Sequence, residues 1–355
     1  MQNRIDNLRE SFESAGIDAV LVSNPYNLRY LTSFTGTYGW AVIGKEKCVF
    51  ITDFRYDEQA RRQCKGYDIV VLEKGIFETI FNVLQELGIS NLGFEDNHIT
   101  YRQYENYSSA FKNVNLFPVK NSIQELRTIK DEEEISKIQR AAQIADSAFS
   151  HILEIIKPGV SELDIALELE FYMRKNGASS LSFDTIVASG QRSSMPHGVA
   201  TNKLIRYGDT VTIDFGCVFE GYCSDMTRTI FVGKVDEKLK EIYEIVLQAQ
   251  LAALDILKPG IISRDVDRIA RGIISEKGFG DNFGHSLGHS VGLEIHEKPR
   301  LSSKDETVLK QGMVLTVEPG IYVEGLGGVR IEDLVVITQE GFQNLVTSPK
   351  DLIIL

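Results

Sequence analysis

The sequence of 355 residues lacks the features that mark membrane, secreted and nucleic-acid-binding proteins. It has no run of about eighteen apolar residues, which a membrane-spanning helix needs. Its N-terminus, MQNRIDNLRESFESAGIDAV, is charged and has no apolar core of a signal peptide. Acidic side chains outnumber basic ones by 50 to 38, and the net charge of −12 argues against a polyanionic partner. The net charge does not exclude any class of small substrate.

Cysteine is scarce as well, with four residues at positions 48, 64, 217 and 223. They form no C-x-x-C pair, which argues against a zinc ribbon or a thioredoxin-type redox site. Because the sequence has no export signal, we expect reduced and mostly buried thiols in a cytoplasmic protein.

The length exceeds that of one ordinary core and predicts two domains. Residues 1–121 alternate amphipathic helices with short apolar strands, which indicates an α/β layer with a mixed sheet. They carry no catalytic signature, and we interpret Asp53 and Arg55 as a solvated surface pair. A long helical pattern follows and ends at a Lys-Pro-Gly stop, so we place the second domain at 122–355.

The second part of the chain repeats itself. ILEIIKPGVSELDIALELEFYMRKNG (152–177) is similar to ALDILKPGIISRDVDRIARGIISEKG (253–278), at an offset of 253 minus 152, or 101 residues. Each copy has a helix end, a Lys-Pro-Gly stop and a second amphipathic helix that ends at glycine. The pattern predicts an α+β domain with pseudo-twofold symmetry and a cleft between its halves, where ligand sites tend to form.

Two aspartates are predicted to share one face of a hairpin. In GDTVTIDFGCVFEGYCSDMTRTIFVG, a two-residue turn at Glu220-Gly221 makes Asp214 and Asp225 diagonal neighbours, with Cβ atoms about 7 Å apart. Such a pair repels unless a cation lies between its members, and two metal ions about 3.5–4 Å apart would fit. The alternative is a pair of exposed aspartates on a solvated face.

A second hairpin brings two glutamates together. In GMVLTVEPGIYVEGLGGVRIEDLVVIT, a three-residue loop centred on Gly325 places Glu318 directly opposite Glu332. Like charges in opposed positions destabilise a sheet, and a metal would reverse the sign of that interaction. The alternative is again a solvated face.

Histidine is rare and clustered, because three of the six histidines lie in GHSLGHSVGLEIHEKP. His289 is flanked by small residues, and we expect its glycine neighbours to let the backbone approach a ligand closely. It is the best candidate for a nitrogen ligand, whereas His285 and His296 are offset by four and seven residues and need not bind a metal themselves.

Together these motifs resemble the pita-bread metallopeptidase family, which includes methionine aminopeptidase, aminopeptidase P and prolidase. HSLGHSVGLEIHE is similar to the form found in prolidases and aminopeptidases P, and NLRYLTSFTG resembles the creatinase-type N-terminal domain. The resemblance covers the whole chain. It implies an α/β creatinase-like N-terminal domain at 1–121 and an α+β pita-bread catalytic domain with internal pseudo-twofold symmetry at 122–355.

The resemblance also implies a metal site. Asp214 would chelate one ion, Asp225 and Glu332 would bridge two ions, and His289 and Glu318 would complete the second site. A set of four carboxylates and one imidazole favours a hard divalent ion such as Mn²⁺, with Co²⁺ or Zn²⁺ as alternatives.

Further residues match the family's substrate side. His197, in SSMPHGVATN, corresponds to a histidine that steadies the scissile group, and His285 to one that lines the substrate pocket. His296 corresponds to a histidine that stabilises the tetrahedral intermediate, and Arg330 to an arginine that buttresses the site and approaches the substrate. Glu318 is the natural general base, because it can lie at the metal edge and accept a proton from water.

The implied activity is metal-dependent hydrolysis of the Xaa-Pro bond at the N-terminus of dipeptides or short peptides, by a cytoplasmic homodimer. The alternatives are a methionine aminopeptidase, whose minimal forms lack the N-terminal domain, creatinase, which works without metal, and a non-enzymatic binding protein on the same fold. The sequence leaves open dipeptidase against aminopeptidase, the physiological ion, the oligomeric state and the preference before proline.

Overall fold

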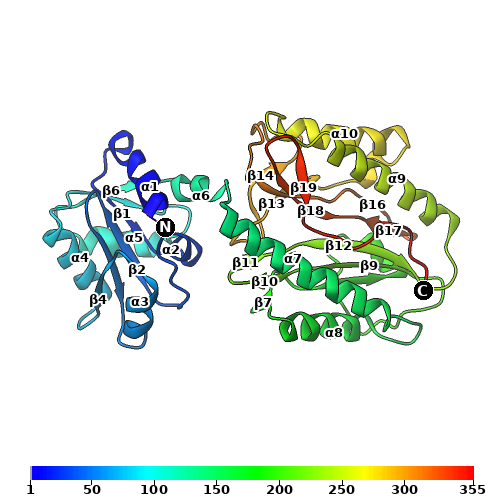
Figure 1. The fold of residues 1–355 in the computed structure, drawn as a ribbon, viewed down its shortest axis with the longest axis horizontal. Coiled ribbons are helices and arrows are strands. Elements are labelled where there is room, and N and C mark those ends of the chain that lie inside the picture. Colours follow the sequence, from blue (N-terminus) through cyan, green and yellow to red (C-terminus); the bar gives the residue numbers. More distant parts are fainter. Residues whose placement is uncertain (1) are drawn as a thin grey trace. The chain divides into compact units, whose positions relative to one another are not determined.

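The computed structural model describes residues 2–355, which divide into one compact unit ending at Arg127 and another from Thr128 to Leu355. The division falls after residue 127 instead of 121 because helix α6 (Ser122–Arg127) belongs to the first unit. Arg127 Nη1 donates to Asn27 Oδ1 at 2.7 Å within that unit. Both units can be followed in Figure 1.

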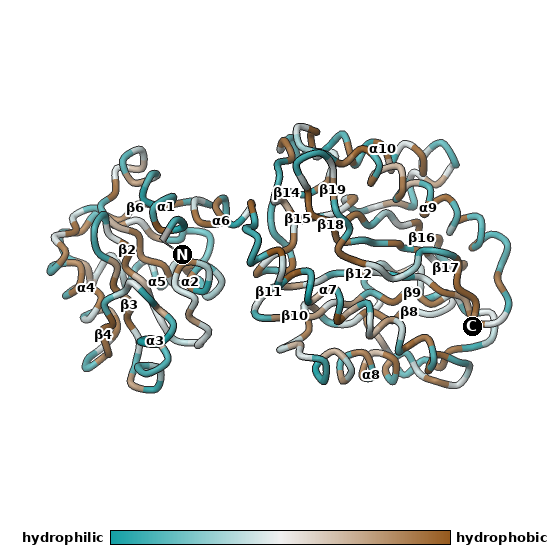
Figure 2. The backbone as a smooth tube through the Cα atoms, in the orientation of Figure 1, coloured by the Kyte–Doolittle hydropathy of each residue, from teal (hydrophilic) through white to brown (hydrophobic). Residues whose placement is uncertain are grey.

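The first unit is an α/β layer around a mixed sheet, as the alternating pattern predicts. In spatial order the strands are β4 (Asp68–Val71), β3 (Cys48–Thr52), β2 (Trp40–Gly44), β1 (Ala19–Val22), β5 (Asn91–Phe94) and β6 (Asn115–Pro118). Strands β1 and β2 pair antiparallel, as do β2 and β3, whereas β1–β5, β5–β6 and β3–β4 are parallel. The helices are α1 (Gln2–Ala15), α2 (Pro25–Thr32), α3 (Asp57–Gln63), α4 (Ile76–Glu86) and α5 (Tyr101–Ala110). Hydrophobic residues concentrate in the strands (Figure 2).

The helices of the second unit carry the repeat seen in the sequence. They are α7 (Glu132–Leu153), α8 (Glu162–Lys175), α9 (Glu237–Asp255) and α10 (Ser263–Glu276). Helices α8 and α10 have 14 residues each and begin 263 minus 162, or 101, residues apart. The glycine that ends each Lys-Pro-Gly stop has a left-handed φ, 94° at Gly159 and 91° at Gly260, which a side chain would disfavour.

The strands of the second unit form small sheets between the helix pairs. They are β7 (Ser180–Leu181), β8 (Ile186–Ser189), β9 (Thr210–Phe215), β10 (Cys217–Phe219), β11 (Tyr222–Cys223), β12 (Met226–Phe231), β13 (Gly288–Ser290), β14 (Glu297–Leu301), β15 (Val314–Val317), β16 (Gly320–Val323), β17 (Gly327–Arg330), β18 (Asp333–Ile337) and β19 (Phe342–Asn344). Helices α7 and α8 contact β8, β10 and β11, whereas α9 and α10 contact β14 to β17.

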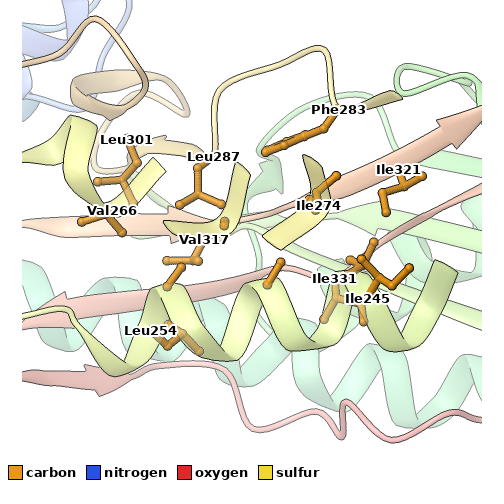
Figure 3. Packing of buried hydrophobic residues seen from close by; sticks show 14 of the residues in the cluster. Ile245, Leu254, Val266, Ile274, Phe283, Leu287, Leu301, Val317, Ile321 and Ile331 are labelled. Carbon is orange, nitrogen blue, oxygen red and sulfur yellow. The ribbon is translucent and has the colours of Figure 1, made fainter. Parts of the chain in front are cut away.

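A hydrophobic core fixes the strands that carry the polar site. Ile245 and Leu254 of α9 and Ile274 of α10 belong to one buried cluster with Val317 and Ile331, which neighbour the predicted glutamates in sequence (Figure 3). Full burial of such a side chain stabilises the fold by about 1.5–3 kcal/mol. The core therefore holds the backbone on either side of the glutamates. No helix in the described range 2–355 is long and apolar enough to cross a membrane.

Candidate metal centre

The first pair of carboxylates lies on the hairpin predicted from the sequence. Glu220 and Gly221 form its two-residue turn, with φ of 46° and 86°, between the pairs Phe219–Tyr222 and Val218–Cys223. The same register continues into β9 and β12, where Asp214 pairs with Thr227. Asp225 lies two residues from Thr227 and is therefore the diagonal neighbour of Asp214.

The second pair also has the predicted register. Residues 324–326 form the loop between β16 and β17, and Gly325 at its centre has a φ of 79°. Val317 pairs with Asp333, and the ladder resumes in the same register beyond the interruption. Glu318 and Glu332 are therefore opposed, as the loop length predicts.

Glu318 and Glu332 lie where the backbone pairing between their two strands is interrupted. Their backbone N–H groups are therefore available to bond other segments, including the first hairpin. The Glu318 N–H donates to Leu287 O at 2.8 Å, and the Glu332 N–H donates to Thr227 O at 3.1 Å. Each backbone thus bonds a strand or loop outside its own ladder, which brings the glutamates toward Asp225 and the histidine run.

All nine residues that the sequence singled out line one cavity of about 400 Å³. They are His197, Asp214, Asp225, His285, His289, His296, Glu318, Arg330 and Glu332. By contrast, Asp53 and Arg55 form an ion pair of 2.6 Å in the first unit, with the arginine side chain largely exposed. That surface pair agrees with its interpretation from the sequence.

The ligand atoms converge within the cavity. Asp225, His289 and Glu332 each offer one possible metal-ligand atom, and these three atoms lie within 4.8 Å of one another. His289 Nε2 is 3.5 Å from Asp225 Oδ2 and 3.4 Å from Glu318 Oε1. Asp214 Oδ2 accepts from Arg330 Nη2 at 2.6 Å, whereas its buried Oδ1 has no hydrogen-bond donor among residues 2–355. A cation would satisfy that oxygen.

The buried carboxylates are close enough to repel one another when ionised, and a cation between them would offset that repulsion. Burial, followed by repulsion from neighbouring carboxylates, raises the pKa of Asp225 and of Glu332 well above the usual range. Burial likewise raises the pKa of Glu318 to about 8. Divalent ions favour the ionised form of each group, and the oxygen-rich donor set fits hard divalent metals. The residues present therefore fit a metal centre.

His289 presents the tautomer that metal binding requires. Its Nδ1 lies 3.2 Å from Ser290 O, which can only accept, so Nδ1 carries the proton and Nε2 has a free lone pair toward the carboxylates. Burial lowers its pKa to about 4 and keeps the ring neutral. Thr316 accepts from the His289 N–H at 3.0 Å and donates to Glu318 at 3.1 Å, which ties the two together.

The glycine before His289 has a different role from the expected one. A Cβ atom at Gly288 would lie 2.0 Å from Thr316 O, in the neighbouring strand β15. The small residue therefore allows the close approach of another strand instead of a ligand. The expectation of ligand approach at this glycine was wrong.

A chain of hydrogen bonds orients the substrate side. Arg330 Nη1 donates to the Tyr322 hydroxyl at 2.8 Å, and that hydroxyl lies 3.0 Å from His285 Nε2. His285 Nδ1 lies 2.8 Å from Ser286 O, so Nδ1 is the donor and Nε2 accepts from tyrosine. Burial lowers the pKa of His285 to about 4, which is consistent with a neutral acceptor.

His197 and His296 are exposed at the same cavity. The ring of His296 lies against that of His289, with centroids 4.5 Å apart. His197 is on the loop between β8 and β9, where the buried Glu162 accepts hydrogen bonds from Ser189 and Thr201 on either side of it. The loop is thus tethered at both ends while its histidine stays accessible.

Sequence reasoning missed three residues around the site. Tyr322 sits in a strand pattern that suggests only hydrophobic packing, and Arg300 lines the cavity eleven positions after His289. Thr227 donates to Glu332 Oε2 at 2.6 Å. Strand periodicity could have found Thr227, because it is two residues from Asp225 and shares its face.

Comparison with known proteins agrees with this geometry. The pattern of metallopeptidase family M24 matches residues 136–339, and that of the creatinase/prolidase N-terminal domain matches residues 4–129. Over 352 residues the chain is 51% identical to an uncharacterized peptidase of Bacillus subtilis (strain 168), covering 99% of this chain and 100% of that one. It is 43% identical to an Xaa-Pro dipeptidase of Pyrococcus furiosus, covering 99% and 100%.

Solved structures give the same result. An Xaa-Pro dipeptidase from Bacillus anthracis superposes with a TM-score of 0.98 at 51% identity, covering 100% of this chain and 99% of that one. An X-Pro aminopeptidase from Thermotoga maritima MSB8 gives 0.92 at 38% identity, covering 98% and 100%. The fold of both units is therefore shared with these peptidases.

Proposed function

The chain belongs to metallopeptidase family M24, and from this premise we propose that it hydrolyses the Xaa-Pro bond of dipeptides. The observation that carries the proposal is the convergence of four carboxylates and a neutral histidine on one cavity. Relatives named Xaa-Pro dipeptidase, alike over nearly their whole length, support the substrate class. The comparisons give no support to a methionine aminopeptidase or to a non-enzymatic binding protein.

The metal centre is dinuclear in this proposal. Asp214 would hold one ion, Asp225 and Glu332 would be shared by both ions, and His289 and Glu318 would hold the other. When bound, the ions supply an activated water and an electrophile for the peptide carbonyl. Mn²⁺ is the preferred ion, because four of the five ligands are carboxylates.

The chain's own side chains move the protons. Glu318 takes a proton from the attacking water, because its carboxylate lies at the edge of the proposed metal site and bound ions would keep it in the ionised form that a base needs. His296 donates a hydrogen bond to the developing oxyanion, and His197 steadies the departing proline nitrogen. Both are exposed at the cavity and can reach a bound peptide. The Arg330–Tyr322 hydrogen bond holds this wall in place.

Specificity for dipeptides is supported by Arg300. It lines the cavity, and its guanidinium has no ion-pair partner within the described residues. A dipeptide places a free carboxylate directly after proline, and a guanidinium can bind that group with two parallel hydrogen bonds. A longer peptide has an amide at this point and loses the ionic contact.

We propose further that the enzyme is a cytoplasmic homodimer. The cytoplasmic location is supported by the four cysteines, which are all free and buried. Light scattering coupled to gel filtration would give twice the chain mass of 39.8 kDa for a dimer. A monomer at micromolar concentration would contradict the dimer and leave the activity untouched.

The activity is tested with Ala-Pro, Ala-Pro-Ala and a Met-Ala peptide, on protein stripped of metal and then restored with Mn²⁺. We expect Mn²⁺-dependent cleavage of Ala-Pro with the highest kcat/KM. Preference for Ala-Pro-Ala would point to an Xaa-Pro aminopeptidase, and cleavage of the Met-Ala peptide would point to a methionine aminopeptidase. Binding of Mn²⁺ without any turnover would refute the proposal.

A further inference from the structure

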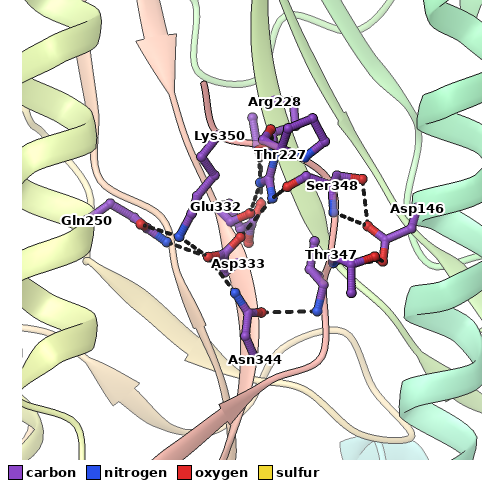
Figure 4. A network of polar contacts seen from close by, with 12 residues as sticks. Asp146, Thr227, Arg228, Gln250, Glu332, Asp333, Asn344, Thr347, Ser348 and Lys350 are labelled. Carbon is purple, nitrogen blue, oxygen red and sulfur yellow. Dashed lines mark hydrogen bonds and ion pairs between the residues drawn. The ribbon is translucent and has the colours of Figure 1, made fainter. Parts of the chain in front are cut away.

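A buried arginine lies behind the metal centre and uses all its hydrogen-bond donors. Arg228, on β12, is 1% exposed and is the largest of the fully buried side chains among the described residues (Figure 4). A guanidinium has five N–H donors. Nε donates to Pro349 O at 3.0 Å, Nη1 to Thr227 O at 2.9 Å and to Glu332 O, and Nη2 to Asp333 Oδ1 and Ser348 O at 2.8 Å each.

Arg228 therefore fixes the distance between the two β-ribbons. The carbonyls of Thr227 and Glu332 come from different hairpins, and one nitrogen of Arg228 bonds both. The Glu332 N–H also donates to Thr227 O. Because Asp225 directly precedes β12, the same contact sets the separation between Asp225 and Glu332 along the backbone.

Thr227 fixes the side chain of Glu332 in the same place. Its hydroxyl lies 3.1 Å from Arg330 Nε and 2.6 Å from Glu332 Oε2. Arginine can only donate, so the hydroxyl accepts from Arg330 and directs its one hydrogen to Glu332. A methyl group in place of the hydroxyl would free the carboxylate to rotate.

The network continues to the end of the chain. Asp333 is fully buried and accepts from Arg228, Gln250, Asn344 and Lys350. Asp146 of α7 accepts four hydrogen bonds from the backbone N–H and hydroxyl groups of residues 347 and 348. The C-terminal segment 346–350 is thus tied on one side to α7 and on the other to the strand that begins beside Glu332 (Figure 4).

We propose that Arg228 and Thr227 are positioning residues for the metal centre, through which the C-terminal segment holds Glu332 at a set distance and rotation. The inference rests on the dinuclear site of the proposed function. Residues that orient metal ligands from behind typically control affinity by 10–100-fold. Neither residue is a ligand or a substrate contact in this proposal, so their effect passes through the residues they bond, which are Glu332 for both and Arg330 for Thr227.

Four variants of the full-length protein test this. Thr227→Val keeps the shape and removes the hydroxyl, and Thr227→Ser restores the hydroxyl. Arg228→Lys keeps the charge and loses the fork. The matched control is Arg271→Lys, because Arg271 also clamps an acid, Asp267, and two backbone carbonyls, but holds the segment 283–285 instead of Glu332.

The measurement is calorimetric titration of metal-stripped protein with Mn²⁺ alone, followed by kinetics on Ala-Pro at saturating Mn²⁺. We expect Thr227→Val and Arg228→Lys to weaken Mn²⁺ binding by about 10–100-fold. Thr227→Ser should restore affinity, and Arg271→Lys should leave it unchanged whatever its melting temperature. If Arg228→Lys does not fold, the comparison of Mn²⁺ affinity between Thr227→Val and Thr227→Ser tests the inference.

Wild-type Mn²⁺ affinity in Thr227→Val would overturn the inference while the proposed function stands. A melting temperature lowered without a change in Mn²⁺ affinity would also overturn it, because that is the signature of a purely structural role. Wild-type protein that binds no Mn²⁺ would instead refute the metal centre itself, and the inference with it.

Discussion

Removal of the metal should make the stability of this protein fall as the pH rises toward 8, and Glu318 allows the effect to be measured. Burial raises the pKa of this carboxyl from 4.5 to about 8 in the folded chain without a cation. The unfolded chain releases the proton near pH 4.5, whereas the folded chain retains it. Between these values the folded state binds more protons, so stability is lost as the pH increases.

The magnitude follows from linkage. Each pH unit inside the window contributes about 1.4 kcal/mol per proton, so Glu318 costs about 2.7 kcal/mol between pH 5.5 and 7.5. His285 and His289 act in the opposite direction below about pH 6.5, because their pKa values are lowered to about 4 and the unfolded chain gains the protons there. Glu318→Gln keeps both histidines, so the difference between wild type and variant removes their contribution. The difference reports Glu318 together with the part of the raised pKa of Asp225 and Glu332 that comes from repulsion by Glu318.

The assay is thermal unfolding of metal-stripped wild type and Glu318→Gln at pH 5.5, 6.5 and 7.5. In a unit of this size 1 kcal/mol shifts Tm by about 2–4 °C, so the gap between the two proteins should change by roughly 5–10 °C in favour of Glu318→Gln as the pH rises. Saturating Mn²⁺ should abolish the contribution of Glu318 to the pH trend in wild type, because the cation favours the ionised carboxylate. Equal pH slopes for wild type and variant without metal would refute the reasoning.

Three substitutions probe other parts of the site. Asp225→Asn should remove Mn²⁺ binding and activity together, because a bridging carboxylate has no neutral replacement; full turnover with two ions bound, measured by metal analysis, would contradict the assignment. His285→Ala should raise KM for Ala-Pro and leave the Mn²⁺ content intact, since its Nε2 accepts from Tyr322; loss of an ion would mean that the wrong histidine was assigned. Arg300→Gln should raise KM for Ala-Pro about 10–100-fold and leave Ala-Pro-Ala nearly unaffected, as expected for a lost charge-assisted pair; equal losses on both peptides would exclude a carboxylate contact.

Much of the arrangement of the proposed metal ligands could be predicted from the sequence, because the length of a turn determines which residues pair along its hairpin. A two-residue turn at Glu220 and a three-residue loop around Gly325 fix every pair along their hairpins, and the structure has both registers. Glu318 and Glu332 are opposed for that reason alone. Loop length and a period of two are local properties, which a sequence displays directly.

Contacts between ribbons could not be predicted in the same way. The Tyr322–His285 hydrogen bond and the Arg330–Asp214 ion pair join segments separated by 37 and 116 residues. Tyrosine in an apolar strand is usually a packing residue, and its pattern contains no sign of a polar partner. The end of the first unit was displaced for a related reason, because Arg127 bonds back to Asn27 across the unit.

The same geometry explains how a metal and a rigid frame would act together at the proposed site. A Cβ atom at Gly216 would lie 2.0 Å from Ser224 O, so only glycine allows the two strands of this hairpin to approach each other so closely beside Asp225. Narrowing forces carboxylates together in a buried place, where their repulsion works against folding. Arg228 opposes that repulsion on the backbone side, since it holds Glu332 from behind whether or not a cation is present. The carboxylates can therefore stay assembled without metal at low pH, where they are protonated, and become a strong cation site as they ionise.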